Sequence, residues 1–179
     1  MAEPTGARTP LEEAVWAALE DVKDPEIPVV SVVEMGIVTG VEVDGGRVVV
    51  QATPTFVGCP ALRIIADGIV RRLLAVPGVA AAEVRWVMEP HWTSDRITPA
   101  GREKLRAFGL APPPGPEEGV GGVPADRAGG VQAGEGTLPP CPYCGSARTR
   151  LENLFGPTPC RSIYYCDDCR NPFEGMKRV

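Results

Sequence analysis

Two pairs of cysteines with the spacing C-x2-C lie near the carboxyl end of the sequence, and they constrain the fold of that region more than any other feature. Each pair turns the backbone so that two sulfurs face one point, and two such turns can form a tetrahedral set of four thiolates. This geometry suits Zn²⁺, and it also suits a single iron. The expected ligands are Cys141, Cys144, Cys166 and Cys169.

The segment that holds these cysteines, residues 141–179, is too short to bury a core that would fold by itself. We therefore expect the metal to supply its folding free energy. Apolar residues between the pairs, such as Leu151 and Ile163, fit the hairpin of a zinc ribbon. A fifth cysteine, Cys160, is a small buried residue, an exposed functional thiol or a ligand exchanged into the site, and the sequence leaves these three options open.

Length and charge limit the class of protein. A chain of 179 residues can form one ordinary domain and a small module. The formal net charge of −5 and the absence of a basic stripe with interleaved aromatic residues argue against nucleic acid or an anionic membrane as the main partner. The sequence shows neither a signal peptide nor an apolar run long enough to span a membrane. We expect a cytoplasmic protein, in which paired cysteines indicate a metal site rather than disulfides.

The first part of the chain, residues 1–111, has the pattern of a small α+β domain. Apolar residues recur with helical spacing in two segments, and Thr9 with Glu12 has the pattern of a capping box at the start of the first. β-Branched residues around a turn signal predict a hairpin, and an alternating segment predicts a third strand. This order predicts two layers, with helices on one face of a short sheet. The segments are 10–23 and 61–74 for the helices, 37–43 and 47–53 for the hairpin, and 83–88 for the third strand.

The composition changes after this domain. A third helix is expected at residues 98–108, with Arg102 and its other basic side chains in solvent. About half of residues 112–140 are glycine or proline, and almost none of the others could form a core. We therefore expect a flexible linker over this range, followed by a four-cysteine zinc-ribbon module at residues 141–179.

A single cysteine of the first domain, Cys59, lies where a predicted strand leads into the second predicted helix. Pro60 fits the first helical position, so the thiol is expected beside the free N–H groups of a helix start, where the helix dipole favours thiolate. Gly58 allows the backbone to bend or a ligand to approach closely. A cysteine in this place can be a nucleophile, a metal ligand, a redox thiol or simply a small buried residue.

Other residues of the first domain are candidates to support this thiol. The carboxylates of Asp24 and Glu26 can bind a metal, cap a backbone turn or lie in solvent. His91 is the one histidine of the chain, and it is either a surface residue or a ligand or proton donor near Cys59. The supporting residues expected around the thiol are Asp24, Glu26, Thr53, Thr55, Gly58, His91 and Trp92.

These motifs resemble a known family. The first domain resembles the SufT-like iron–sulfur assembly factors through Asp24-Pro25-Glu26-Ile27-Pro28, Gly36-Ile37-Val38, Thr53-Pro54-Thr55, Gly58-Cys59-Pro60 and the loop that ends at Trp92. The resemblance extends to the PaaD family of phenylacetate-degradation proteins through Gly101-Arg102, Cys141-Pro142-Tyr143-Cys144-Gly145-Ser146, Thr158-Pro159-Cys160 and residues 165–169. It covers nearly the whole chain except the linker and the first few residues.

The resemblance implies an accessory protein of the multicomponent oxygenase that epoxidises phenylacetyl-CoA. It implies that Cys59 is a functional thiol, which holds or passes iron or an iron–sulfur cluster or contacts a client protein, and that the partners are the oxygenase and reductase subunits. One alternative is a structural or regulatory subunit of that oxygenase with no role in metal delivery. Another is an enzyme with Cys59 as nucleophile, for which His91 is the sole histidine base. A redox pair of Cys59 with Cys160 is a further alternative.

Overall fold

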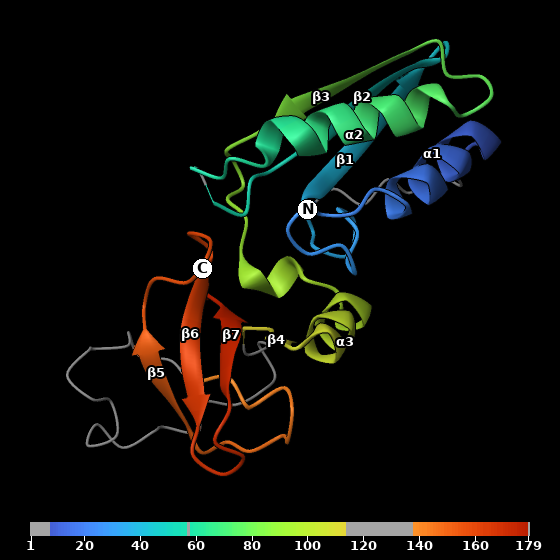
Figure 1. Ribbon diagram of the computed structural model, residues 1–179. Coiled ribbons are helices and arrows are strands. Elements are labelled where there is room, and N and C mark those ends of the chain that lie inside the picture. Colours follow the sequence, from blue (N-terminus) through green and yellow to red (C-terminus); the bar gives the residue numbers. More distant parts are fainter. Residues whose placement is uncertain (1–7, 57, 114–137, 179) are drawn as a thin grey trace. The chain divides into compact units, whose positions relative to one another are not determined.

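A computed structural model of the chain describes residues 8–56, 58–113 and 138–178. These residues form two compact units (Figure 1). The first unit contains the described residues up to 54 together with residues 60–91. The second unit contains the loop at 55–59 and the described residues from 92 onward.

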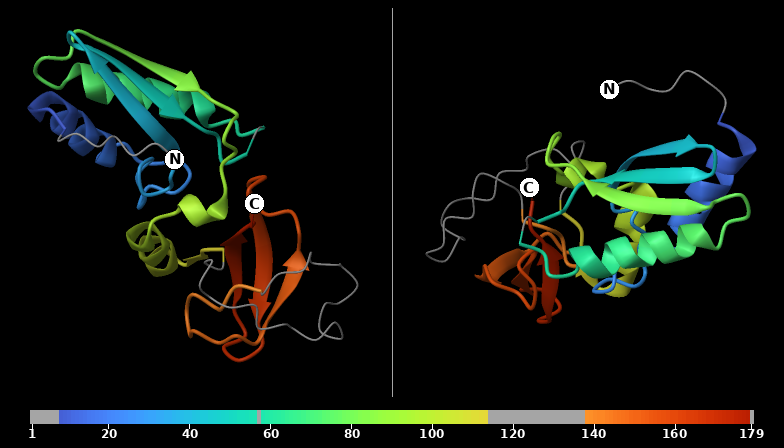
Figure 2. Two further views of the ribbon diagram at one scale, coloured as in Figure 1. Left: turned by 180° about the vertical axis from the view of Figure 1, so that it is seen from behind. Right: turned by 90° about the horizontal axis from the view of Figure 1, so that it is seen from above.

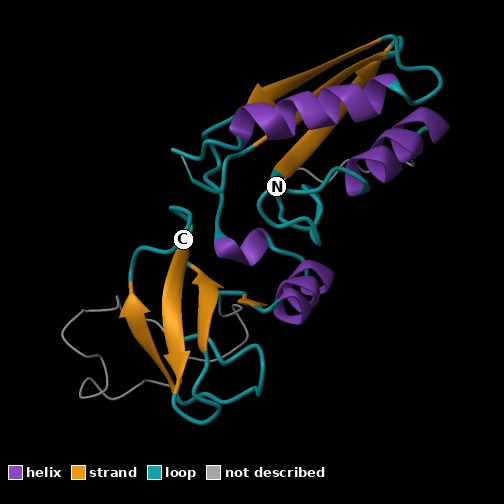
Figure 3. Cartoon of the chain, viewed as in Figure 1, coloured by secondary structure: helices purple, strands orange, loops and turns teal. Residues whose placement is uncertain are grey.

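The first unit is a two-layer arrangement of helices and a sheet, as predicted. Its elements in chain order are α1 (Pro10–Glu20), β1 (Val38–Asp44), β2 (Arg47–Ala52), α2 (Leu62–Leu74) and β3 (Ala81–Trp86). The sheet order is β1-β2-β3, with β1 antiparallel and β3 parallel to β2. Helix α2 makes the crossover between the two parallel strands and lies along the sheet, with α1 beside it (Figure 2, Figure 3).

One face of this sheet is apolar and the other is polar. Val48 and Val50 of β2 are completely buried on the helix side, where Ile69 of α2 is also completely buried. On the opposite face Arg47 pairs with Glu83 of β3 at 2.8 Å in solvent. The alternation of strand side chains produces this division, and it leaves the helices on one face of the sheet.

Helix α1 begins as its sequence predicts. The Thr9 hydroxyl accepts a hydrogen bond from the Glu12 N–H at 3.2 Å, and the Glu12 carboxylate accepts one from the Thr9 N–H at 2.6 Å. The predicted capping box is therefore confirmed. The helix ends at Glu20 rather than near Lys23, because Lys23 forms an isolated bridge with Ser31 and has left the helix.

The second unit contains a four-stranded sheet of order β4-β7-β6-β5. Before the sheet come η1 (Ser94–Arg96) and α3 (Pro99–Phe108), and its strands are β4 (Leu110–Ala111), β5 (Thr149–Asn153), β6 (Arg161–Cys166) and β7 (Pro172–Met176). Strand β4 pairs parallel with β7, whereas β5, β6 and β7 form an antiparallel ribbon. The sequence places the end of the first domain at residue 111. In the structure residues 92–111 group by their contacts with the ribbon, to which β4 supplies a fourth strand.

Arg102 of α3 corrects another expectation. Its guanidinium donates to the carbonyl oxygens of Ser94 at 2.6 Å, Ile97 at 3.3 Å and Pro113. The side chain is therefore not in solvent, because it links η1, the start of α3 and the end of β4. The Ser94 carbonyl also accepts a hydrogen bond from the Ile97 N–H at 3.3 Å. A planar group with several donors suits a position that faces three carbonyl oxygens.

The expected linker at residues 112–140 is described only at its ends. Pro113 is completely buried, and the Pro139 carbonyl accepts a hydrogen bond from the Thr149 hydroxyl at 2.9 Å. Residues 114–137, where the rest of this prediction falls, lie outside the described ranges. Among the helices of the described residues, none has the length and apolar character that crossing a membrane requires.

Candidate metal centre and the Cys59 loop

The two C-x2-C segments fold into the same turn. In the first, the N–H of Gly145 donates to the carbonyl of Cys141 at 2.9 Å; in the second, the N–H of Arg170 donates to the carbonyl of Cys166 at 2.9 Å. Gly145 and Arg170 both have the left-handed backbone conformation, with φ of 73° and 60°. We call residues 141–145 the first knuckle and residues 166–170 the second knuckle. The first precedes β5, and the second joins β6 to β7.

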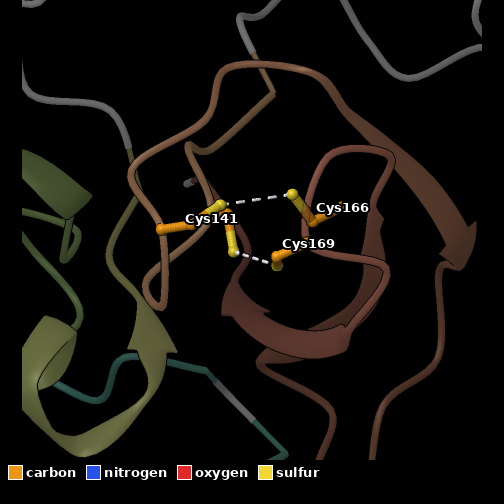
Figure 4. A group of neighbouring side chains, drawn as sticks. Cys141, Cys166 and Cys169 are labelled. Atoms are coloured by element: carbon orange, nitrogen blue, oxygen red, sulfur yellow. Dashed lines mark hydrogen bonds between the residues drawn. The ribbon is translucent and has the colours of Figure 1, made fainter.

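The two knuckles bring four sulfurs together. The sulfurs of Cys141, Cys144, Cys166 and Cys169 all lie within 4.8 Å of one another. Two of the separations, from Cys141 to Cys169 and from Cys144 to Cys166, are 3.6 Å (Figure 4). All six cysteines lie in the described ranges, and none forms a disulfide.

These distances fit a tetrahedral metal site. A Zn–S bond of about 2.3 Å implies sulfur separations of about 3.8 Å in a regular tetrahedron, whereas a disulfide needs about 2 Å. Four protein sulfurs would fill such a site and leave no open position for substrate, so a metal held by these cysteines would have a structural role. Among the residues that the structure describes, no other group of three or more histidine, cysteine or acidic side chains gathers in this way.

Burial and hydrogen bonds shift the pKa values of three of these thiols in different directions. Burial raises the pKa of the Cys141 thiol. Burial also acts to raise the pKa of Cys169, but hydrogen bonds from the side chain and the N–H of Asn171, and from the neighbouring thiols, lower it to about 6. The N–H of Ser146 acts to lower the pKa of Cys144, but desolvation and the neighbouring thiols raise it to about 12. Without a metal, Cys141, Cys144 and Cys169 therefore do not ionise together, whereas a bound cation stabilises the thiolate form of its ligands.

The loop that carries Cys59 begins at the end of β2. Thr53 is buried, and its N–H donates to the Ile37 carbonyl at 2.8 Å. Further on, the N–H of Cys59 donates to the Phe56 carbonyl at 3.0 Å, which closes a short turn. The Cys59 side chain is half-buried in this turn.

Helix α2 begins later in the sequence than Pro60, the first helical position that the sequence predicts. The helix begins at Leu62 with Ala61 as its N-cap, so Pro60 is not the first helical position. Pro60 and Ala61 form a turn, and the first helical hydrogen bond runs from the Ile65 N–H to the Ala61 carbonyl at 2.9 Å. The prediction that Pro60 is the first helical position is therefore wrong.

One candidate acid of the first unit, Asp24, bonds to the backbone. One oxygen of Asp24 accepts hydrogen bonds from the N–H groups of Glu26 at 2.8 Å and Ile27 at 3.1 Å. Of the roles considered for Asp24, the structure shows the capping of a turn. The carboxylate supplies an acceptor for the two N–H groups that lie between Pro25 and Pro28.

The remaining candidates lie in both units. His91 is exposed in the first unit, with its Nε2 3.2 Å from a carboxylate oxygen of Glu89. Trp92, 3% exposed, begins the main part of the second unit. A Cβ atom on Gly58 would lie 3.3 Å from the Phe56 ring, so the glycine leaves room for that ring. The second unit holds Thr55, Gly58, Cys59, Trp92 and Cys160, whereas the first holds Asp24, Glu26, Thr53 and His91.

Cys160 is separate from the four-sulfur cluster. It lies in the connection from β5 to β6, where its sulfur is 3.2 Å from the Thr158 hydroxyl and its carbonyl accepts from the Lys177 N–H at 2.9 Å. The thiol is half-buried rather than fully buried or fully exposed. The structure therefore gives the ribbon four converging sulfurs and one that stands apart.

The sequence did not single out the acids of the second knuckle. Asp167 and Asp168 both pair with arginines that precede or belong to β5, Asp168 with Arg148 at 2.9 Å and Asp167 with Arg150. A separate hollow of about 370 Å³ on the second unit contains the pair Arg161–Glu174, whose closest atoms are 2.9 Å apart. Its other lining residues are Phe108, Gly109, Leu110, Tyr143, Ile163, Pro172 and Phe173.

The sequence did contain a signal for Asp167 and Asp168, because both lie between the two cysteines of one C-x2-C pair.

Comparison with known proteins identifies the two parts of the chain. Residues 12–86 match the family model described as "Iron-sulfur cluster assembly protein". Residues 126–177 match the model described as "PaaD zinc beta ribbon domain". The chain thus joins a domain of the iron–sulfur cluster assembly class to a zinc ribbon.

One known protein matches nearly the full length of this chain. A protein of Escherichia coli (strain K12), named as a subunit of a 1,2-phenylacetyl-CoA epoxidase, is 36% identical over 173 residues, which cover 95% of this chain and 94% of that protein. This chain therefore belongs to the PaaD family.

Two further proteins each match about half of this chain. The Bacillus subtilis (strain 168) protein named "Fe-S protein maturation auxiliary factor YitW" is 38% identical over 89 residues, which cover 49% of this chain and 86% of that protein. A solved structure of a DUF59 domain from Bacillus anthracis is 33% identical, with a TM-score of 0.49, and covers 53% of this chain and 91% of that one.

Proposed function

We propose that this protein is an accessory factor of a phenylacetyl-CoA epoxidase and that it assists the assembly of iron or iron–sulfur centres in that enzyme. The observation that carries the proposal is the match of one chain, over 95% of its length, to a protein named as a subunit of such an epoxidase. The iron–sulfur cluster assembly model covers Cys59, and a relative of this region is named as an Fe-S protein maturation factor. Under the proposal the protein is not the catalyst of the epoxidation.

Cys59 is the functional thiol in this proposal. A thiolate is a soft ligand that suits iron and iron–sulfur clusters, and a half-buried thiol in a loop can exchange what it binds. Its loop is grouped with the unit that contains the ribbon. The ribbon serves as a docking module for the oxygenase and reductase subunits, and its four cysteines hold a structural Zn²⁺. The cluster or iron on Cys59 is cargo and not a resident cofactor.

The test compares anaerobically purified wild-type protein with Cys59→Ser, using Cys160→Ser as a matched control because Cys160 is also half-buried. We expect about one zinc per chain in all three, with iron and acid-labile sulfide only in the wild type and in Cys160→Ser. We also expect Cys59→Ser to fold normally and to fail to support epoxidase activity. Full activity of Cys59→Ser would contradict the role of the thiol.

A second function is favoured by the name of the Escherichia coli relative, which is called a subunit. In that case the chain is a structural or regulatory subunit of the epoxidase and delivers no metal. It would then co-purify in fixed stoichiometry with the catalytic subunits, and Cys59→Ser would leave activity intact. A factor that assists assembly would instead be dispensable once the metal centres of the epoxidase are complete.

A further inference from the structure

The two knuckles contact each other through a carboxylate as well as through sulfur. Asp168 lies in the second knuckle, between the ligands Cys166 and Cys169. One of its oxygens is 2.9 Å from Nη1 of Arg148, and the other accepts a hydrogen bond from the Ser146 hydroxyl. Both partners closely follow the first knuckle, so one carboxylate joins the two halves of the site.

Ser146 continues this connection to the first cysteine. Its carbonyl accepts a hydrogen bond from the Cys141 N–H at 2.9 Å, and its hydroxyl accepts one from the Arg148 N–H at 3.0 Å. A continuous series of hydrogen bonds therefore runs from the backbone of Cys141 through Ser146 to Asp168. We call Ser146, Arg148 and Asp168 the carboxylate clasp.

The clasp is too exposed to contribute much stability as an ion pair. The side chains of Arg148 and Asp168 are 63% and 42% exposed, and pairs of this kind contribute little to stability. Its geometric effect is larger, because metal binding requires all four sulfurs at one spacing. Contacts that orient the ligands reduce the conformational freedom that is lost on binding, and removing such contacts lowers metal affinity by about 10–100-fold.

We infer that Asp168 is a positioning residue for the four-cysteine site, which holds the two knuckles at the separation that the metal requires. The inference rests on metal binding by the four cysteines, and it concerns metal affinity rather than the role of Cys59. The neighbouring Asp167 differs, because its side-chain partner Arg150 lies within β5 and also pairs with Glu152 at 2.7 Å.

The test is the affinity of the full chain for Zn²⁺, measured by competition with a chromophoric chelator. Asp168→Asn removes the charge and one of the two acceptor oxygens, and Ser146→Ala removes the hydroxyl at the other end of the contact. Each should weaken binding by about tenfold, and the double variant should be little worse than either. Glu152→Gln is the matched control, because Glu152 pairs at similar exposure with Arg150 of β5 rather than with a residue next to the first knuckle, and Arg150 keeps its own pair with Asp167. The control should bind Zn²⁺ as the wild type does.

The absorption spectrum of the Co²⁺-substituted protein separates positioning from a change of ligands. Asp168→Asn should keep the wild-type spectrum of a tetrahedral four-thiolate site, since it removes no ligand. Zn²⁺ affinity equal to that of the wild type, or lowered only as much as in Glu152→Gln, would overturn the inference. If Asp168→Asn does not fold, Ser146→Ala gives the same comparison, since it removes only one hydroxyl. A wild-type chain that binds no Zn²⁺ would overturn the metal site itself, and the clasp with it.

Discussion

The sheet of the first unit lies against two helices, whereas the ribbon of the second unit has little apolar surface to bury. Residues from α1, β2 and α2 in the first unit are completely buried, among them Val15, Leu19, Val48, Val50, Ile69 and Leu73. The core of the ribbon consists of Ala111, Cys141, Tyr164, Cys166 and Phe173, so two of its five buried residues are cysteines of the metal cluster. Aliphatic packing holds the first unit, and we expect a metal to replace that packing in the second.

The largest expected effect comes from removing one sulfur of the cluster. Cys141→Ser should lose the metal and unfold the ribbon, because structural zinc sites contribute about 10–16 kcal/mol of apparent binding free energy that is coupled to folding. The first unit should remain folded. Zinc analysis with limited proteolysis would measure both results, and Cys160→Ser is the control because its sulfur lies outside the cluster. Retention of one zinc per chain in Cys141→Ser would show that the ligand set is wrong.

A cavity in the first unit should destabilise that unit and leave the metal site of the second unit intact. Ile69→Ala removes a completely buried side chain of α2 and should lower the free energy of unfolding of the first unit by about 2–5 kcal/mol without changing the zinc content. Urea denaturation combined with zinc analysis would show this. Ile64→Ala on the same helix is the control, because Ile64 is 60% exposed and its loss should have little effect. Loss of zinc in Ile69→Ala would mean that the two units do not fold independently.

Arg102 tests whether the second unit depends on more than its metal. Arg102→Ala removes donors to three carbonyls and should lower the stability of the zinc-loaded second unit by about 2 kcal/mol. Arg102→Lys should recover only part of this, because an ammonium lacks the planar arrangement of donors. The measurement is the thermal unfolding of the zinc-bound protein. Wild-type stability in Arg102→Lys would show that charge, and not the fork geometry, matters at this position.

The smallest expected change in stability comes from substitutions at equivalent positions of the two knuckles. Gly145 and Arg170 occupy equivalent left-handed positions, and only glycine adopts that conformation without steric cost. Arg170→Gly should therefore stabilise the second knuckle slightly, by less than about 1 kcal/mol, whereas Gly145→Ala should destabilise the first by about 1 kcal/mol. Thermal unfolding of the zinc-bound chains would compare the two. A destabilised Arg170→Gly would indicate that the arginine side chain contributes more than its backbone conformation costs.

Local patterns allowed much of this architecture to be predicted. The capping box of Thr9 and Glu12, the hairpin around Gly45 and Gly46 and the amphipathic α2 each depend on residues that are neighbours in the chain. The convergence of two C-x2-C turns could be expected for the same reason, because each turn is a local structure. The start of α2 was predicted less well. Pro60 is compatible with a first helical position, but here it belongs to the turn before the helix.

Other features depend on contacts between distant residues. A two-residue strand such as β4 has no periodicity of its own, and only its pairing with β7 assigns residues 92–111 to the second unit. Arg102 has the sequence pattern of a solvated helix residue, and only the folded chain places three carbonyls around it.

The amino-acid sequence by itself determined the two-layer first unit and the four cysteines that meet in the second, because hydrophobic periodicity and C-x2-C spacing act within a few residues. Only the tertiary structure decided where the two units divide, at which residue α2 begins and which carboxylate joins the knuckles. Such contacts join segments whose composition is ordinary. These contacts form only when the whole chain folds, so no short sequence pattern predicts them.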